Sequence, residues 1–336
     1  MRYYDIKITD KSGKLVLPPT GGVSKNSTYT SYVNGKTLSA ALNVELDIPV
    51  AVYATPSGSG WVRIWGVSLK EVGQQNDLIG KTIAVSGGFQ KGLPLANPSQ
   101  NGLLARGLIL QAFGNWVGTD MTLDLMMVPV LPPGIGDPPS TQPNIVLNWK
   151  KGQSLQDTLQ QCLSTAFPGY TLDFRISNKL KLNQDNPSFH GDLVDLGQHV
   201  KAATVGLVDS DYPGVDFLIR DKKFIVFDGT TQKTPRDIAF KDLIGQPTWI
   251  DSPTIQFKTA MRADVVVGDF VKLPPGLVTT SRGVQGSQVD LKTAFNGSFL
   301  VQNIRHVGNF RQPSGDSWVS VFDAVPTKQQ QVQQAA

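Results

Sequence analysis

Residues 42–48 have the sequence LNVELDI, and their alternation decides the fold class. Four apolar side chains occupy the even positions, and Asn43, Glu45 and Asp47 stand between them. Successive side chains of a strand point to opposite faces of a sheet. The stretch therefore predicts a β-strand with one buried face and one polar, acidic face.

Residues 61–69 carry a similar pattern with one break. Apolar residues take one parity at positions 62 and 64 and the other parity at positions 65, 67 and 69. An inserted residue reverses the face that each following side chain takes. The change of parity beside Gly66 therefore predicts a β-bulge.

A β-hairpin is expected further along. Residues 107–113 and 121–128 are strand-like segments that flank a polar turn containing glycine. Thr122 and Asp124 take the polar face of the second segment, and Trp116 lies at the tip. We expect Trp116 to be exposed and to contact a partner or a sugar, or else to fold back onto the sheet.

The composition favours strands and turns. The 336 residues include 33 glycines and 22 prolines, and Glu45 and Glu71 are the sole glutamates among 27 acidic residues. Asp favours caps and turns whereas Glu favours helices, so a helix bundle or coiled coil is excluded. The net charge of +4 is spread along the chain and does not indicate the basic cluster of a nucleic-acid-binding face.

The chain divides at residues 131–143 (LPPGIGDPPSTQP), whose prolines predict a stiff, extended linker. Residues 1–130 form the first predicted β domain. Helix and strand patterns alternate over residues 144–233, which predicts a small α+β unit. Strand patterns return over residues 234–326, the second β domain, and residues 327–336 form a glutamine-rich flexible tail.

Three elements of the later part can be placed more closely. One helix is expected to begin at Ser154 and another to cover residues 192–203, each starting at a residue that favours the helix N-terminus. A hairpin is expected over residues 215–227. His306 ends a predicted strand, and we expect its ring to point outward.

The sequence contains no pattern typical of an enzyme or a metal site. Cys162 is the single cysteine, which suits a reducing compartment, and its helical spacing favours a buried apolar role. The three histidines lie in different predicted elements, so no metal is expected. A glycosidase commonly uses a Glu proton donor, and glutamate is scarce here. We expect no catalytic residue, no cofactor, no signal peptide and no membrane span.

Several segments of the second half together resemble a known family. The residues that carry the resemblance are DLVDLGQHVKAATVG at 192–206, VDFLIRDKKFIVF at 215–227, ADVVVGDFVKL at 263–273 and FLVQNIRHVGN at 299–309. In this order they look like the helix, hairpin and paired strands of the hub proteins of contractile phage-tail baseplates. That family is related to the hub part of type VI secretion spike proteins. The resemblance extends over residues 1–326.

The resemblance implies a mainly β fold with two tail-tube-like antiparallel β-barrel or sandwich domains and an α+β insertion. It implies a homotrimeric ring that joins the six-fold tail tube to the three-fold central spike, with a channel that DNA passes without specific binding. The implied partners are a tail-tube or tube-initiator protein, the central spike protein and baseplate wedge proteins. The protein would be made in the host cytoplasm and reside in the virion tail baseplate, without catalysis or cofactor.

The polar positions of the predicted strands are candidates for the channel lining. They are Asn43, Glu45, Asp47, Thr122 and Asp124. Negative charge there would repel passing DNA. Ordinary exposure to solvent is the simpler explanation of the same positions.

Two other functions remain open. The predicted exposure of Trp116 and the long loops fit a β-rich carbohydrate-binding or carbohydrate-active protein. The same fold also fits a tail-tip adaptor of a non-contractile phage.

Overall fold

The computed structural model describes most of the chain. The described residues are 1–16, 28–52, 59–90, 97–128, 144–182, 189–210, 212–220, 223–230, 234–251, 254–274, 295 and 297–326. The predicted linker and the predicted glutamine-rich tail lie outside them. The α-helices of the described part are α1 (Leu69–Gly73), α2 (Leu155–Ala166) and α3 (Leu193–Thr204).

Strands account for most of the regular structure. In the first part of the chain they are β1 (Arg2–Thr9), β2 (Tyr29–Thr30), β3 (Tyr32–Val33), β4 (Lys36–Thr37), β5 (Asn43–Ala51), β6 (Gly60–Trp65), β7 (Thr82–Phe89), β8 (Gly102–Val117) and β9 (Asp120–Val128). In the middle they are β10 (Ile145–Leu147), β11 (Thr171–Arg175), β12 (Phe189–Gly191), β13 (Asp216–Arg220) and β14 (Lys223–Phe227). In the last part they are β15 (Arg236–Asp237), β16 (Thr248–Trp249), β17 (Ile255–Ala260), β18 (Phe270–Lys272), β19 (Ser298–Asn309) and β20 (Trp318–Pro326).

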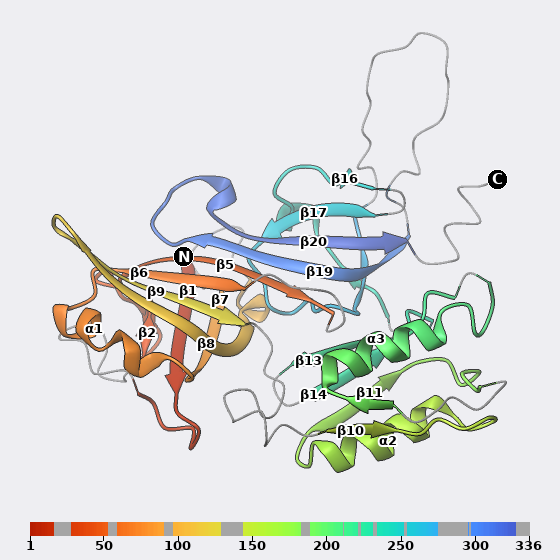
Figure 1. The fold of residues 1–336 in the computed structure, drawn as a ribbon. Helices are drawn as coiled ribbons and strands as arrows, with labels where there is room; N and C mark the ends of the chain where they lie inside the picture. The colour runs from red at the N-terminus through yellow and green to blue at the C-terminus, as the bar shows by residue number, and fades with distance from the viewer. Residues whose placement is uncertain are drawn as a thin grey trace, which may run out of the picture.

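Strands from the two ends of the chain form one large sheet (Figure 1). Its order is β16-β17-β20-β19-β5-β6-β9-β8-β7-β1-β2, and β15 is attached through β18 to β19. Neighbours along this order are antiparallel. The prediction of a mainly β fold with an α+β insertion is therefore confirmed.

The long strand β19 joins the two predicted β regions. Along one edge it pairs with β20, and along the other it pairs first with β18 and then with β5. The partners in the β5 segment run from Asn303 opposite Ala51 to Asn309 opposite Glu45. The first and last parts of the chain therefore share one continuous sheet.

Buried apolar side chains connect the parts of the molecule as well. Met261 and Trp318, from the last part of the chain, belong to the core of the first β region, and the Trp318 indole donates to Gly88 O at 3.0 Å. A second core fills the α+β unit. A third core lies under the last strands and includes Leu218 and Phe227 of that unit.

The α+β unit follows the predicted helices closely. Asp192 precedes α3 and its carboxylate accepts the N–H of Asp195 at 2.9 Å, which satisfies a donor that the first turn leaves open. The helix α2 follows Ser154, and its buried side chains recur at helical spacing. In the three-stranded sheet, β14 lies between β13 and β11 (Figure 1).

The prediction of a strand with a bulge at Gly66 is wrong after that residue. Gly66 has a φ of 79°, strand β6 ends before it, and α1 begins three residues later. Ser68 and Glu71 form a reciprocal capping box, in which the Glu71 carboxylate accepts the Ser68 N–H at 2.7 Å. The S-x-x-E pattern favours the start of a helix. Here it outweighs the apolar alternation, which favours continuation of the strand.

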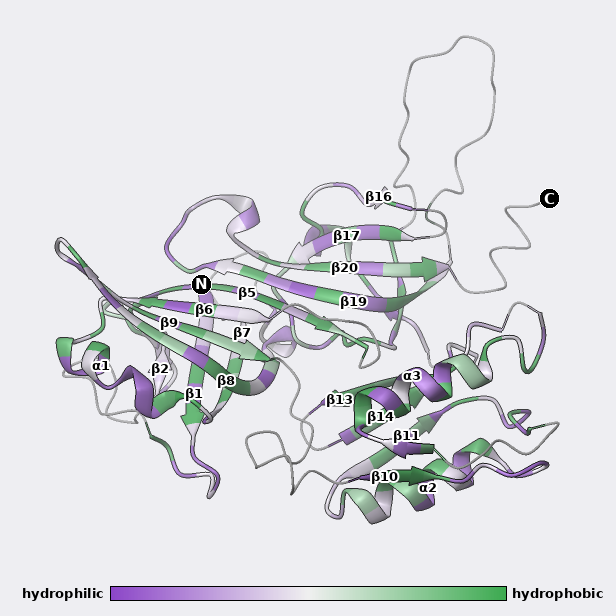
Figure 2. Cartoon of the chain, viewed as in Figure 1, coloured by the Kyte–Doolittle hydropathy of each residue, from purple (hydrophilic) through white to green (hydrophobic). Residues whose placement is uncertain are grey.

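The prediction of an outward ring for His306 is also wrong. The ring is buried, with 2% of its surface exposed. A register shift between Val301 and Asn303 reverses the alternation of β19, so that Ile304 and His306 face the core. Figure 2 shows hydrophobic and hydrophilic bands along β19 and β20.

Candidate functional site

The predicted channel positions of β5 and β9 lie on one face of the main sheet. In the register, Glu45 is opposite Arg63 and Arg63 is opposite Asp124, and directly paired residues share a face. We call this surface the open face. It comprises Asn43, Glu45, Asp47, Trp61, Arg63, Trp65, Thr122, Asp124, Lys258, Arg305 and Asp323.

Arg63 is the centre of the open face over β6. Its guanidinium donates to both carboxylate oxygens of Asp124, at 2.7 and 2.9 Å. It also lies 5.9 Å from the ring centre of Trp61 and 5.7 Å from that of Trp65. Hydrogen bonds to Asp124 raise the pKa of Arg63, so this cation is fixed between two aromatic rings and a carboxylate.

The acids of β5 have partners on β19. Arg305 donates to the two carboxylate oxygens of Asp47 at 2.7 and 2.5 Å, and Asn309 donates to Glu45 at 2.8 Å. Asn43 accepts the backbone N–H of Arg311 at 3.1 Å. Arg305 thus neutralises Asp47, as Arg63 neutralises Asp124, whereas Glu45 keeps its negative charge and accepts a hydrogen bond from a neutral amide.

Thr122 differs from the other predicted channel positions. It is buried, with 7% of its surface exposed, and lies between Trp65 and Asn115 in the register. The sequence analysis missed Arg63 and Arg305, although both lie at polar positions of alternating strands. Alternation predicts which face of its strand a residue occupies, but it does not predict which strands are neighbours in the sheet.

The open face continues over the last strands and is hollowed there. A depression of about 560 Å³ lies over β17, β20, β19 and β5 and is lined by Lys258, Arg305 and Asp323, among others. Asp323 accepts a hydrogen bond from Gln256 at 3.0 Å. The hollowed part of the open face thus carries charges of both signs.

Exposed apolar side chains follow β8 to the tip of the β8–β9 hairpin, at one end of this sheet. Leu110, Phe113, Trp116 and Val117 are 45–75% exposed. Phe113 and Val117 pair with Asp124 and Asp120 on the open face, whereas Trp116 pairs with Met121 and points to the other face. The predicted exposure of Trp116 is confirmed, and its indole donates to Gly118 O at 2.9 Å. We call these four residues the hairpin cluster.

The opposite end of the sheet carries a second apolar group. Phe240, Trp249 and Ile250 are 72%, 40% and 52% exposed and lie along the outer edge of β17, where β16 pairs and where Leu243 bridges to Thr259. We call them the β16 cluster. Figure 1 places β16 and the tip of the β8–β9 hairpin at opposite ends of the sheet.

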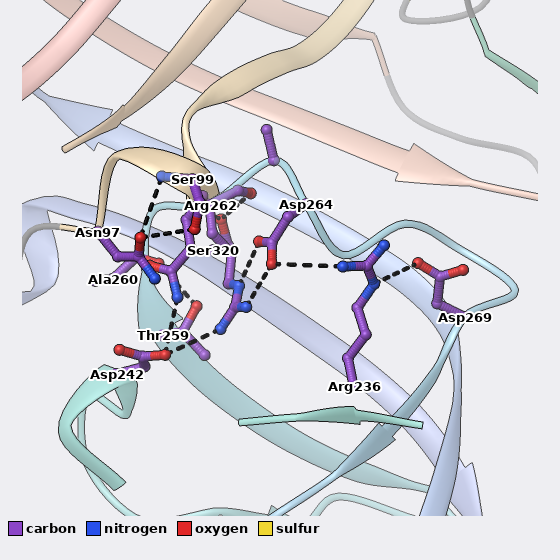
Figure 3. Close-up of polar contacts among 12 residues, drawn as sticks. Asn97, Ser99, Arg236, Asp242, Thr259, Ala260, Arg262, Asp264, Asp269 and Ser320 are labelled. Atoms are coloured by element: carbon purple, nitrogen blue, oxygen red, sulfur yellow. Dashed lines mark hydrogen bonds and ion pairs between the residues drawn. The ribbon is translucent and has the colours of Figure 1, made fainter. Parts of the chain in front are cut away.

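A buried ionic network fixes the last part of the chain against the first (Figure 3). Arg262 is 3% exposed and its guanidinium contacts Asp242 at 3.3 Å and Asp264 at 2.7 Å. The side-chain amide of Gln100, from the first β region, donates to the same Asp242 at 2.9 Å. The two carboxylates supply the partners that a buried guanidinium needs, since a buried charge without a partner is costly.

The network extends into the α+β unit. Arg236 contacts Asp264 at 3.9 Å and Asp269 at 3.5 Å, and Asp269 lies 3.5 Å from Arg175 of β11. Asp264 and Asp269 have the positions of ordinary turn residues in the sequence. Their role in joining all three parts becomes visible only with the tertiary structure.

Within the described ranges, no group of three or more His, Cys, Asp or Glu side chains could hold a metal ion. No helix in that part of the chain is long and apolar enough to cross a membrane. Burial raises the pKa of the Cys162 thiol to about 11, which keeps it protonated at neutral pH.

Comparisons with known proteins add a likeness of fold. No family model and no curated protein matches the chain. Among solved structures, it is similar to the 43 kDa tail protein of prophage MuSo2 from Shewanella oneidensis, with 8% identity, a TM-score of 0.49 and 97% of each chain covered. It is also similar to a tail protein from Neisseria meningitidis MC58, with 10% identity, a TM-score of 0.46, and 97% of this chain and 96% of that chain covered.

A third similar structure is described as a lidless PdpA-VgrG complex. The identity is 8%, the TM-score is 0.46, and the alignment covers 97% of this chain and 65% of that chain. At these identities the likeness is one of fold.

Proposed function

We propose that this chain is a structural baseplate hub of a contractile phage tail. Three copies form a ring that joins the six-fold tail tube to the three-fold central spike, and DNA passes through its channel without specific binding. The ring contacts a tube or tube-initiator protein, the spike protein and wedge proteins within the virion. The chain acts as an assembly component and not as an enzyme.

The observation that carries this proposal is the pair of apolar groups at opposite ends of one open sheet. The backbone of Ile109 still bonds to Gly80 and Lys81, at 2.9 and 3.0 Å. Beyond it, the strand pairs of the described structure join β8 to β9 alone, so residues 110–117 present a strand edge beside the hairpin cluster. Exposed edges and large apolar groups favour contact with another chain. A hairpin cluster that packs against the β16 cluster of a second copy repeats head to tail and closes into a ring.

The open face supports the proposed channel. In a closed ring of these sheets, the open face, with the depression over β19 and β5, faces inward. Glu45, Asp47 and Asp124 would line it together with Arg63 and Arg305. Paired charges of both signs offer DNA neither a binding site nor strong repulsion, which suits passage without specific contacts.

The proposal is tested by measuring the oligomeric state of the purified protein. We expect light scattering after size exclusion to give three copies per particle at micromolar concentration, and electron microscopy of assembled tails to show a ring. Trp116→Asp and Trp249→Asp, at the two ends of the sheet, should each yield monomers, because either one places a charge in the shared apolar contact.

Val205→Asp is the matched control. Val205 is 56% exposed but lies after α3 in the α+β unit, outside both clusters. This variant should remain trimeric. A wild-type protein that stays monomeric at micromolar concentration, with no ring in assembled particles, would refute the hub.

A further inference from the structure

A cavity of about 330 Å³ lies where the three parts of the molecule meet. The first β region contributes residues near the end of β1 and from β8, the α+β unit contributes part of β13, and the last part contributes the segment before β18 and part of β19. Its apolar walls include the buried side chains of Leu104, Leu218, Val265, Val267 and Ile304. A volume of this size accommodates a small ligand.

The charged residues that line this junction cavity are mostly basic. Lys11, Arg106 and Arg220 line it, and Asp10 is the acidic side chain among the described lining residues. The Asp10 carboxylate already accepts the N–H groups of Ser12 and Lys14, both at 2.9 Å, and so holds its own turn together. The described lining therefore carries an excess of positive charge.

Arg220 is held in place at the wall of the cavity. Its Nη2 donates to Leu103 O at 2.9 Å and to Ala263 O at 3.0 Å, which are backbone groups of the other two parts. Burial, and secondarily the charge of Arg220, lower the pKa of His306 to about 3. The neutral His306 ring lines the cavity and thus lies within the field of a fixed guanidinium.

We propose that the junction cavity binds a small organic anion, a carboxylate or phosphate group attached to a short apolar body. Arg106 and Arg220 bind the anionic group, since guanidinium groups match the geometry of both oxyanions. The apolar body packs against Val265, Val267 and Ile304. Because all three parts line the cavity, binding also stabilises their relative arrangement. This proposal is independent of the hub function.

The test uses His306 as a reporter of the cavity. The sequence has three histidines, so ring-labelled protein gives few signals, and His190→Gln and His199→Gln assign the remainder. Phenyl phosphate and hexanoate are titrated in parallel, which distinguishes the two anionic groups, and benzyl alcohol serves as the neutral compound. We expect either or both anions to shift the His306 signals to saturation, with the other two histidines unmoved and benzyl alcohol without effect.

Variants of the basic residues locate the site. Arg106→Met and Arg220→Met should each weaken binding at least tenfold, since charge-assisted hydrogen bonds are lost. Lys7→Met also removes one positive charge from the first β region but lies outside the cavity lining, so its affinity should equal that of the wild type. Arg220 also holds two carbonyls, so Arg106→Met decides the test where Arg220→Met unfolds.

Three results would overturn the proposal. One is a His306 signal that neither anion moves at millimolar concentration. Another is an equal shift with benzyl alcohol, which would make the cavity a purely apolar site. The third is binding that Arg106→Met leaves unchanged.

Discussion

His306 shows how a single buried group makes the stability of this chain depend on pH. Its Nδ1 lies 2.8 Å from the Ser320 hydroxyl, and its pKa is lowered to about 3, chiefly by burial. In the unfolded chain an imidazole has a pKa of about 6.5. Between these values the unfolded chain binds a proton that the folded chain does not, so stability present above pH 6.5 is lost as the pH falls.

We therefore expect His306 to reduce the free energy of unfolding by about 2 kcal/mol between pH 7 and pH 5, at roughly 1.4 kcal/mol per pKa unit. Urea unfolding at pH 7, 6 and 5 measures this slope. His306→Gln should remove it, because the amide does not titrate. His190→Gln, at an exposed position, should keep the wild-type slope. Equal slopes for wild type and His306→Gln would contradict the assignment.

The charged residues of the open face show how far a sequence pattern can predict the position of a residue. The alternation at residues 42–48 correctly placed Asn43, Glu45 and Asp47 on one face away from the core. It left open which side chains oppose them. Arg305 is 258 residues from Asp47 along the chain, so only the pairing of β5 with β19 brings them together.

At the scale of elements, Gly107 permits the close approach of β8 to the end of β9. A Cβ at this position would lie 1.9 Å from the carbonyl oxygen of Val128. A backbone carbonyl cannot rotate out of the way as a side chain does. Gly107→Ala must therefore displace one strand of the hairpin that carries the hairpin cluster.

We expect Gly107→Ala to lower the free energy of unfolding by about 2–3 kcal/mol, the upper range for overpacking. Urea denaturation measures the loss. Gly73→Ala is the matched control, because a Cβ at Gly73 meets nothing within 4 Å and alanine favours the helix α1. A loss no greater for Gly107→Ala than for Gly73→Ala would show that β8 moves freely there.

Elements whose start residues and apolar spacing indicate the same structure could be predicted from the sequence. Elements for which these patterns disagree could not. The helices after Ser154 and Asp192 begin as the sequence indicates, because their start residues and apolar spacing agree. In the β8–β9 hairpin the strands extend until Val117 is opposite Asp120, leaving a shorter turn than predicted. There, cross-strand pairing outweighs the turn preference of glycine and asparagine.

For the whole molecule, the joints between the parts matter as much as the parts. Arg2 at the start of the chain donates to Asn309 O at 2.8 Å, and Trp318 packs into the first core. No local sequence pattern predicts such contacts, because Arg2 and Asn309 are 307 residues apart in the chain. A rigid arrangement of this kind suits the proposed hub, since a ring closes only where each copy holds a fixed angle.

Arg262 provides the sharpest test of these joints. Arg262→Met would leave Asp242 and Asp264 without their buried cation, and removal of one member of a buried ion pair costs about 3–5 kcal/mol. We expect chemical denaturation to show a loss of this size. Hydrogen exchange should also become faster at the Ala263 amide, which donates to Gln100 O across the joint at 2.8 Å.

Arg305→Met is the control for Arg262→Met, because it removes a guanidinium from an ion pair whose arginine is 62% exposed. Exposed pairs contribute less than about 1 kcal/mol, so this variant should unfold almost as the wild type does. Equal losses in the two variants would mean that the buried network does not hold the parts together. A large loss confined to Arg262→Met, with faster exchange at the joint, would identify the network as what fixes their relative orientation.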